Sequence, residues 1–392
     1  MKLACVVHRF GADIAGGSEG HCRAVAEHLA ARHTVTILTT CAKDHITWRN
    51  YYPPGESALG PLRVLRFPVA RERQLHRFMD LSDRVFADRA SSEEQEQWFR
   101  ENGPDAPELL EHLRVHGVEY DRVLFWSYRY ADTYFGLPLV ADRAVLVPTA
   151  EEDPLIHVDA VRAFFSQPRG FLFLTPEEQA LVGARAPAGR PSAVIGSGLD
   201  PTAGPANLAA LDVLRLRDPF ALYLGRIDPN KGCGTLIRNF LRYIDVRKER
   251  EALAERSVQL VMAGPSSMPI PEHPLIRPLG FVEDDVREAL LSTARVLVMP
   301  SPFESLSMVL LEAWNRGLPA LVNARCKVLR GQVERADGGL YYGTAAEFMA
   351  ALDYLLDHPD EARQLGQQGL AYVNREYRWP TVIEKIETLL RI

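Results

Sequence analysis

Apolar and polar positions in the first half of the chain follow two alternating periods, one typical of strands and one typical of helices. An apolar run over Leu3–Val7 leads into a glycine-rich turn (residues 11–20), a helical pattern over His21–Arg32 and a second apolar run over Val35–Thr40. A strand, a helix and a strand in this order predict a β-α-β unit with parallel pairing. Later apolar runs predict further strands of the same sheet at Val64–Phe67, Val123–Trp126, Val145–Pro148, Phe171–Leu174 and Ala193–Ile195.

Residues 74–99, between these strands, have helical periodicity. Their apolar side chains recur at helical spacing, at Leu75, Phe78, Met79, Val85 and Phe86. Because an amphipathic helix usually faces a core, the stripe predicts packing against the first domain.

The composition changes after Ile195. Residues 196–219 are rich in glycine, proline and short polar side chains, which predicts a linker. A second alternating series follows, with strands expected at Phe220–Leu224, Val258–Ala263, Leu275–Pro278, Val296–Met299 and Ala320–Val322. Its helices are expected at Gly232–Tyr243, Asp284–Thr293, Ser307–Arg316, Ala345–Asp357, Glu361–Tyr372 and Pro380–Leu390. The pattern predicts an α/β protein with two doubly wound domains, residues 1–195 and 196–377.

Composition agrees with two globular domains and excludes some classes of function. The chain has 392 residues, 47% of them hydrophobic and 24% charged, which is enough for two cores. A net charge of −6 argues against binding nucleic acid by electrostatics. No apolar run approaches the roughly 18 residues of a membrane-spanning helix, and Leu3–Val7 is too short for a signal peptide.

The cysteines indicate neither a zinc site nor a disulfide framework. The chain has 5 of them, an odd number, and no two form a C-x-x-C pair. A cytoplasmic location is therefore expected.

Ligands of doubly wound sheets bind at the carboxyl ends of the strands, so three junctions that follow strands are of interest. The first is Gly16-Gly17-Ser18-Glu19. Adjacent glycines let backbone amides approach a ligand, and the helix N-terminus that follows favours anions. The alternative is a tight turn that needs positive φ. The junction lacks G-x-G-x-x-G, and Thr39-Thr40 ends strand two without an acidic residue, which argues against an NAD enzyme.

The second junction is the segment from Gly225 to Gly232. Arg226 follows a strand and Lys231 precedes a helix. Two cations at one strand end suit a diphosphate. The alternative is a pair of solvated surface cations. The P-loop pattern G-x-x-x-x-G-K-[ST] is absent.

The third junction is residues 300–307, which lead into a helix that carries Glu312. If Glu304 and Glu312 are both helical, their backbones are about 12 Å apart, too far for the roughly 5–9.5 Å of a glycosidase pair. That spacing suits two hydroxyl-bearing groups on either side of a diphosphate, with the amides of Ser305, Leu306 and Ser307 holding the phosphates.

The alternatives for the two acids are a helix cap for Glu304 and a surface position for Glu312. Glu312, however, lies among Leu310, Leu311, Ala313 and Trp314. A carboxylate buried in such a helix needs a partner or a ligand.

Together these motifs resemble the retaining GT-B glycosyltransferases of family 4, the glycosyl transferases group 1. The resemblance rests on Gly225-Arg226, Lys231-Gly232 and Glu304-x7-Glu312. It extends over nearly the whole chain, through Gly16-Gly17, a hinge at residues 196–200 and Tyr377-x-Trp379.

The resemblance implies a GT-B fold of two facing Rossmann-like domains with the site in the cleft between them. It implies that a final helix, residues 378–392, crosses back to the first domain. Arg226 and Lys231 would bind the donor diphosphate, Glu304 would lie near the donor sugar and Glu312 would bind the nucleotide ribose. Gly16 and Gly17 would complete the donor site. The resemblance implies no metal and no other cofactor.

Two departures from the family pattern concern the reacting centre. Many members have Phe-Gly where this chain has Leu306-Ser307. Many also have a histidine in the N-terminal domain, which the stretches 126–130 and 148–154 lack. Tyr128, Glu151 and Glu152 are the candidates for contact with the acceptor, and His157 is a further one.

The function expected from the resemblance is transfer of a sugar from a UDP- or GDP-sugar to a hydroxyl, with retention, in the synthesis of cell-surface glycans or glycoconjugates. The acceptor would be a glycan, a lipid-linked compound or a small molecule. Because no residues form a nucleophile and acid pair, catalysis is expected from positioning and from stabilisation of the leaving diphosphate by Arg226 and Lys231, with Glu304 at the sugar. A sugar-nucleotide epimerase and a non-catalytic sugar-nucleotide-binding subunit are the alternatives.

A basic segment of the first domain suggests peripheral association with the inner face of a membrane. Its arginines are Arg63, Arg66, Arg71, Arg73, Arg77, Arg84 and Arg89. With the apolar stripe of residues 75–86, they could bind anionic lipid or a lipid-diphosphate acceptor. The alternative is a solvated helix over the core.

Overall fold

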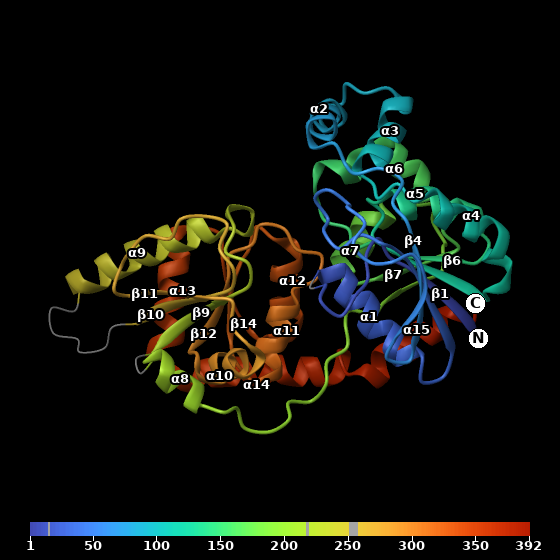
Figure 1. Cartoon of the computed structure of the whole chain (residues 1–392). Coiled ribbons are helices and arrows are strands. Elements are labelled where there is room, and N and C mark those ends of the chain that lie inside the picture. Colours follow the sequence, from blue (N-terminus) through green and yellow to red (C-terminus); the bar gives the residue numbers. More distant parts are fainter. Residues whose placement is uncertain (15, 217–218, 251–257) are drawn as a thin grey trace. The chain divides into compact units, whose positions relative to one another are not determined.

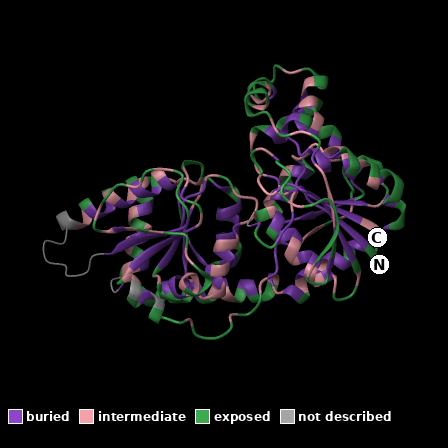
Figure 2. Ribbon diagram, in the orientation of Figure 1, coloured by how far each residue is buried: buried purple, intermediate pink, exposed green. Residues whose placement is uncertain are grey.

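The chain forms two compact α/β units in the computed structural model, which describes residues 1–14, 16–216, 219–250 and 258–392 (Figure 1). Unit 1 comprises Met1–Gly198 and Trp379–Ile392, and unit 2 comprises Leu199–Arg378. The sequence predicted boundaries after residues 195 and 377. These lie three residues and one residue before the boundaries in the structure. The expected α/β class is confirmed, since in each unit a sheet of mostly buried strands lies between helices (Figure 2).

The sheet of unit 1 has the order β3-β4-β2-β1-β5-β6-β7-β8. Every neighbouring pair is parallel except β3 and β4. From β1 the chain moves outward through β2 to β4, and it then restarts on the other side of β1 at β5, so the order reverses between β1 and β5. The strands are β1 (Lys2–Val6), β2 (Thr34–Thr40), β3 (Gly55–Leu59), β4 (Leu62–Phe67), β5 (Arg122–Trp126), β6 (Ala144–Val147), β7 (Gly170–Phe173) and β8 (Ser192–Val194).

The helical region expected at residues 74–99 is two helices, α2 (Leu75–Phe86) and α3 (Ser92–Asn102). A capping box formed by Ser91 and Glu94 starts α3, which explains the break. The edge strand β3 and the short helices α4 to α7 were not expected, because their apolar runs are short. The other helices of unit 1 are α1 (Gly17–Leu29), α4 (Pro107–His116), α5 (Ala131–Gly136), α6 (Asp159–Phe164), α7 (Pro176–Gly183) and α15 (Trp379–Leu390), with single turns η1 (Gly117–Glu119), η2 (Leu137–Val140) and η3 (Pro154–His157).

The sheet of unit 2 has the order β11-β10-β9-β12-β13-β14 and is parallel throughout. Its chain order reverses between β9 and β12, where a ligand of such a sheet is expected to bind. The strands are β9 (Phe220–Leu224), β10 (Gln259–Ala263), β11 (Ile276–Gly280), β12 (Val296–Met299), β13 (Ala320–Asn323) and β14 (Gly339–Tyr342).

The helices of unit 2 cover both faces of this sheet. They are α8 (Ala209–Leu214), η4 (Pro229–Lys231), α9 (Cys233–Arg250), α10 (Asp284–Thr293), α11 (Met308–Asn315), α12 (Lys327–Ala336), α13 (Ala345–Asp357) and α14 (Pro359–Glu376). The expected linker therefore contains a short helix, α8. Residues 217–218 of that linker, and residue 15 of the glycine-rich turn, lie outside the described residues. Within the described ranges, no helix combines the length and apolar character needed to cross a membrane.

The C-terminal helix α15 packs in unit 1. The Trp379 ring stacks on the His28 ring of α1 at a centroid distance of 3.7 Å. The same indole lies against Gly198, where any side chain would overlap it. Glu387, on the last turns of α15, pairs with Arg32 at 3.2 Å and His33 at 3.1 Å. These contacts tie the end of the chain to the end of α1.

Replacing Glu387 should destabilise unit 1 in a pH-dependent way. Burial acts to raise the pKa of Glu387, but His33 and Arg32 outweigh it and leave the pKa lowered. A lowered pKa stabilises the fold above the ordinary pKa of a glutamate, and this contribution is lost as pH falls through the lowered value. We therefore expect Glu387→Gln to reduce the free energy of unfolding by roughly 1.5–3 kcal/mol at pH 7, with the difference shrinking below about pH 4. Urea unfolding across pH measures this, and a difference that does not depend on pH would contradict it.

Candidate active site

The candidate donor residues of unit 2 lie beside the reversal between β9 and β12. Gly225 and Arg226 directly follow β9, and residues 300–307 directly follow β12. Because β9 and β12 are parallel neighbours, their carboxyl ends lie at the same edge of the sheet. The topology therefore brings together two segments that are more than seventy residues apart in the chain.

Glycines let these backbones approach closely. Gly232 has φ of 76°, and a Cβ there would overlap the Pro300 carbonyl. Gly264, with φ of 141°, packs in the same way on the Gly225 carbonyl. A side chain at either glycine would force the segments apart, since both positions combine positive φ with backbone contact.

The approach of Gly232 to Pro300 places Lys231 beside Glu304. Lys231 Nζ lies 2.9 Å from Glu304 Oε1, and the Glu304 side chain is 12% exposed. The alternative of two solvated cations is therefore wrong for Lys231. Arg226 is 57% exposed, and its Nε lies 3.4 Å from a carboxylate oxygen of Asp228. Arg226 thus presents a largely accessible guanidinium at this edge.

Glu304 lies in the loop before α11, which begins at Met308. The premise that Glu304 and Glu312 share a helix is therefore wrong, and the spacing derived from it does not apply. The helix cap is Ser307, whose hydroxyl accepts from the Leu310 amide at 3.3 Å, so the capping alternative for Glu304 is also wrong. Ser305, Leu306 and Ser307 precede the helix, and their contact with phosphate stays a prediction.

Glu312 on α11 has a partner that the sequence did not reveal. Arg287 of α10 forms an ion pair with its carboxylate, which is only 20% exposed. The surface alternative for Glu312 is therefore wrong. Burial raises the pKa of Glu312, with Arg287 opposing that shift. Arg287 thus opposes the effect of burial and favours the ionised form of Glu312.

Two buried side chains support the backbone of these loops. The Tyr223 hydroxyl donates to the Arg226 carbonyl at 2.7 Å. The Cys326 thiol accepts from the Glu304 amide, and burial raises its pKa to about 11. Sequence reasoning missed both, because a tyrosine within a strand and a lone cysteine look like ordinary core residues.

In unit 1, the paired glycines lie at the reversal between β1 and β5. Gly16 has φ of −98°, and Gly17 is the first residue of α1, so the tight turn with positive φ is wrong. A Cβ on Gly16 would overlap the Glu19 carboxylate, whereas a Cβ on Gly17 would meet open space. Gly16 therefore accommodates Glu19, and Gly17 keeps the start of α1 accessible.

The Glu19 carboxylate is the centre of a buried polar cluster that the sequence did not reveal. Its Oε1 lies 3.0 Å from His8 Nε2 and 2.5 Å from Arg9 Nε. Burial acts to raise the pKa of Glu19, but His8 and Arg9 hold it well below its usual range. The His8 ring lies on the Tyr130 ring at 3.8 Å, so the cluster joins the loops after β1 and β5.

The acceptor-side candidates differ in exposure and do not form one cluster of contacts. Tyr128 is fully buried in the core of unit 1, which favours a structural role over acceptor contact. Glu151 is half-buried and Glu152 is exposed, both between β6 and η3. The exposed His157 accepts from Arg185 at 2.7 Å.

Most arginines of the basic segment already have partners. Arg63 pairs with Glu56, Arg71 with Glu101 and Asp105, Arg77 with Glu101, and Arg84 with Glu94. Arg66 donates to the Phe10 carbonyl at 3.0 Å. These ion pairs leave fewer free cations on this segment than the sequence suggested, and its binding to anionic lipid stays a prediction.

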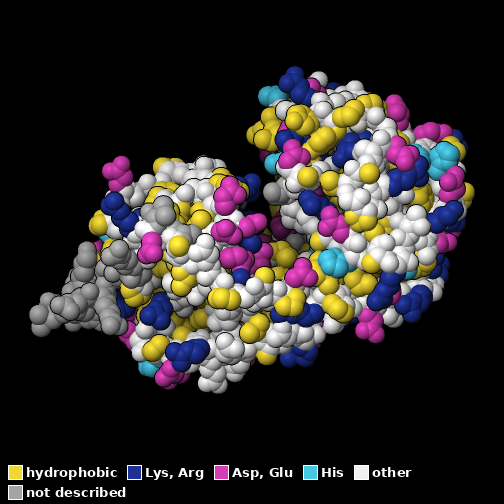
Figure 3. All heavy atoms as spheres, turned by 60° about the horizontal axis from the view of Figure 1, so that its bottom comes forward, with side chains coloured by type: hydrophobic (Ala, Val, Ile, Leu, Met, Phe, Trp, Pro, Cys, Tyr) yellow, Lys and Arg dark blue, Asp and Glu magenta, His cyan; other side chains and the backbone are white. Residues whose placement is uncertain are grey.

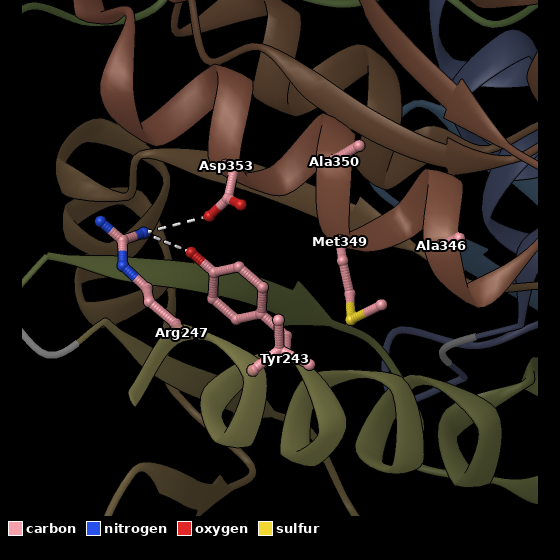
Figure 4. A pocket seen from close by; sticks show the side chains of 7 residues that line it. Tyr243, Arg247, Ala346, Met349, Ala350 and Asp353 are labelled. Atoms are coloured by element: carbon pink, nitrogen blue, oxygen red, sulfur yellow. Dashed lines mark hydrogen bonds and ion pairs between the residues drawn. The ribbon is translucent and has the colours of Figure 1, made fainter. Parts of the chain in front are cut away.

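A small hollow of about 160 Å³ lies elsewhere on unit 2, between α9 and α13 (Figure 4). Arg247 there bonds the Tyr243 hydroxyl and lies 3.4 Å from Asp353. None of the sequence-predicted site residues lines it. Among the described residues, no group of three or more His, Cys, Asp or Glu side chains is placed to hold a metal ion.

Comparison with known proteins identifies the segment that carries the unit 2 site. Residues 218–358 match the family model described as Glycosyl transferases group 1. The chain is 29% identical over 161 residues to the MMP alpha-(1->4)-mannosyltransferase of Mycolicibacterium hassiacum, a match that covers 39% of this chain and 38% of that protein. The matched part thus spans well under half the length of this curated relative.

Solved structures resemble the whole chain at low sequence identity. Sucrose-phosphate synthase from Thermosynechococcus elongatus superposes with a TM-score of 0.71 at 17% identity, over 100% of this chain and 98% of that one. Anabaena HepE in complex with UDP-glucose gives 0.68 at 15% identity over 100% of both chains. The α,α-trehalose 6-phosphate synthase from Burkholderia multivorans gives 0.71 at 14% identity, over 100% of this chain and 97% of that one. The chain therefore has the GT-B fold, and its residues 218–358 match the group 1 glycosyltransferases.

Proposed function

We propose that this protein transfers a sugar from a nucleoside-diphosphate sugar to a hydroxyl group, with retention at the anomeric carbon. The observation that carries the proposal is the Lys231–Glu304 pair at the reversal between β9 and β12, inside the segment that matches a glycosyltransferase family. Retention and a role in the synthesis of cell-surface glycans or glycoconjugates are inferred from the family resemblance.

The donor diphosphate would bind at Arg226 and Lys231. In the reaction the bond between the anomeric carbon and the diphosphate breaks, and the electron pair leaves with the diphosphate. The acceptor oxygen bonds to the same face of the carbon, and its proton passes to the departing phosphate oxygen. Two cations at this edge stabilise the charge that develops there. No metal ion or other cofactor is part of the proposal.

Glu304 would have two tasks. Its carboxylate orients Lys231 through the 2.9 Å pair and can accept hydrogen bonds from hydroxyls of the donor sugar. Because the lysine already has a carboxylate partner, the diphosphate must share it rather than meet a fully solvated cation. The pair keeps the lysine in place before the donor arrives, which is a form of positioning.

The nucleotide ribose would donate to Glu312, which Arg287 favours in its ionised form. Since Anabaena HepE binds UDP-glucose and a partial relative is a mannosyltransferase, UDP-glucose and UDP- and GDP-mannose are the first donors to test. The acceptor would be a glycan, a lipid-linked compound or a small molecule, met at the cytoplasmic side or at the inner face of a membrane.

Release of UDP or GDP with and without acceptor separates the proposal from its alternatives. An epimerase would change the sugar without releasing nucleotide, and a non-catalytic subunit would bind the donor unchanged. Both alternatives share the donor site, so only the fate of the sugar distinguishes them.

Removing either cation should slow turnover strongly. Charge-assisted hydrogen bonds are worth roughly 1.5–3 kcal/mol, so we expect Lys231→Ala and Arg226→Ala each to lower kcat/KM about 10- to 150-fold. Arg363→Ala is the control, because Arg363 is a 68% exposed arginine of the same unit that pairs with Asp360. Initial rates of nucleotide release measure the effect. Values within twofold of the wild type for both cation variants would remove these residues from the donor site.

Replacing Arg287 should make nucleotide binding more sensitive to acid. The ionised Glu312 accepts from ribose, so affinity falls as pH drops through its pKa, which burial already raises. Arg287→Met removes the opposing charge, so the loss of UDP or GDP affinity should begin at higher pH. Calorimetric titrations across pH 5–8 measure this, and the nucleotide's own ionisation cancels in the comparison of proteins.

The matched control is Arg316→Met, which removes a neighbouring guanidinium that pairs with Glu288 rather than Glu312. Its pH profile should follow that of the wild type. If the Arg287→Met profile also coincides with that of the wild type, Arg287 has no part in nucleotide binding.

A further inference from the structure

The four charged side chains at the proposed diphosphate site balance one another. A carboxylate oxygen of Asp228 lies 3.4 Å from Arg226 Nε. Glu304 Oε1 lies 2.9 Å from Lys231 Nζ, so each cation faces a carboxylate. A hydrogen bond from the Asn230 amide, 2.8 Å long, holds the pKa of Asp228 below its usual range, which keeps that carboxyl ionised at neutral pH. A diphosphate that enters this cluster therefore meets cations whose charge is already balanced.

The overall charge of the chain does not favour an anion either. The net charge is −6. On the face that Figure 3 shows, lysine and arginine side chains are spread over the surface with acidic side chains between them. Surface charges more than about 10 Å away are largely screened at 0.1 M salt. The additional positive charge that favours a diphosphate is therefore expected from a side chain at the site itself.

The loop after β13 adjoins the same edge of the sheet. β13 is the parallel neighbour of β12, so residues 324–327 follow a strand end directly beside the one that leads to Glu304. The Asn323 side chain, at the end of β13, donates from Nδ2 to the Pro300 carbonyl at 3.0 Å. Gly232 lies against the same carbonyl group. The turn after β9 and the loop after β13 therefore meet at one point of the segment after β12.

Two further hydrogen bonds fix the loop after β13 at this place. The Cys326 thiol accepts from the Glu304 amide. Asn323 Oδ1 accepts from the Arg325 amide at 3.1 Å. Arg325 thus lies between two residues that are each bonded to the segment 300–304.

The Arg325 side chain is exposed, and within the described ranges its guanidinium has no ion-pair partner. Arg330, one turn into α12, differs in this respect, because it pairs with Glu334 at 2.7 Å. A guanidinium remains charged at any physiological pH and can bond two phosphate oxygens at once. Arg325 therefore adds an uncompensated positive charge beside a cluster that has none.

We propose that Arg325 is a third cation of the donor site and binds the β-phosphate of the nucleoside diphosphate. The inference rests on the proposed function, in which the donor sugar lies at Glu304 and is bonded to the β-phosphate. The loop of Arg325 is tied to the backbone of Glu304, whereas Glu312 and Arg287, proposed for the ribose end, are on α11 and α10. Arg325 would stabilise the charge that the β-phosphate gains when its bond to the anomeric carbon breaks.

The test compares the binding of UDP and GDP with that of UMP and GMP, which lack the β-phosphate. Arg325→Gln should weaken diphosphate binding about 10- to 150-fold, the range of one charge-assisted contact, and leave monophosphate binding within about twofold of the wild type. Arg325→Lys keeps the charge, so it should bind the diphosphates more tightly than Arg325→Gln. Calorimetry at one pH and one salt concentration measures the affinities, and thermal unfolding checks that the variants fold.

The matched control is Arg330→Gln, which removes a 50% exposed arginine of α12 that has its own partner. It should bind UDP and GDP like the wild type. The inference is overturned if Arg325→Gln leaves diphosphate binding unchanged, weakens both kinds of nucleotide equally, or has no more effect than Arg330→Gln. It is also overturned if Arg325→Lys binds as weakly as Arg325→Gln. These results leave the proposed function standing, whereas a wild-type protein that binds neither UDP nor GDP contradicts the proposed function and the inference together.

Discussion

The candidate active site depends on one constraint, the close approach of two loops at the reversal between β9 and β12. Gly232 has no side chain and positive φ, so the turn that carries Lys231 can lie on the Pro300 carbonyl. That contact sets Lys231 against Glu304, and Tyr223 and Cys326 hold the backbones on either side. The chemistry we propose needs this arrangement, because a diphosphate must meet cations whose positions are fixed before it binds.

Carboxylates that are buried or partly buried and pair with cations recur in both units. Glu304 pairs with Lys231, Glu312 with Arg287, and Glu19 with His8 and Arg9. A buried carboxylate without a partner is costly, so each pair offsets part of the cost of placing an acidic group where a ligand's hydroxyl or cation could use it. Under the proposed function, a ligand would have to share these partners. Its binding would exchange one set of charge-assisted contacts for another.

The sequence predicted the features that depend on local pattern and missed those that depend on three-dimensional neighbours. Alternating apolar runs identified the α/β class and most strands, and the spacing of Arg226, Lys231, Glu304 and Glu312 pointed to a segment that matches the group 1 glycosyltransferases. Arg287 was missed because its partner is on the next helix, and His8 because only folding brings it to Glu19. The apolar stripe of α2 was expected to pack on the core, but Leu75, Met79 and Phe86 are exposed. Periodicity shows which side chains share a face but not what covers that face.

The most direct test of the account is a crystal structure of the protein soaked with UDP or GDP. The account predicts diphosphate oxygens within about 2.7–2.9 Å of the Lys231 ammonium and the Arg226 guanidinium, as in charge-assisted hydrogen bonds, and ribose hydroxyls on Glu312. The Lys231–Glu304 pair would remain in contact beside the phosphates. A nucleotide bound elsewhere, or one that leaves Arg226, Lys231 and Glu312 without contact, would contradict the account.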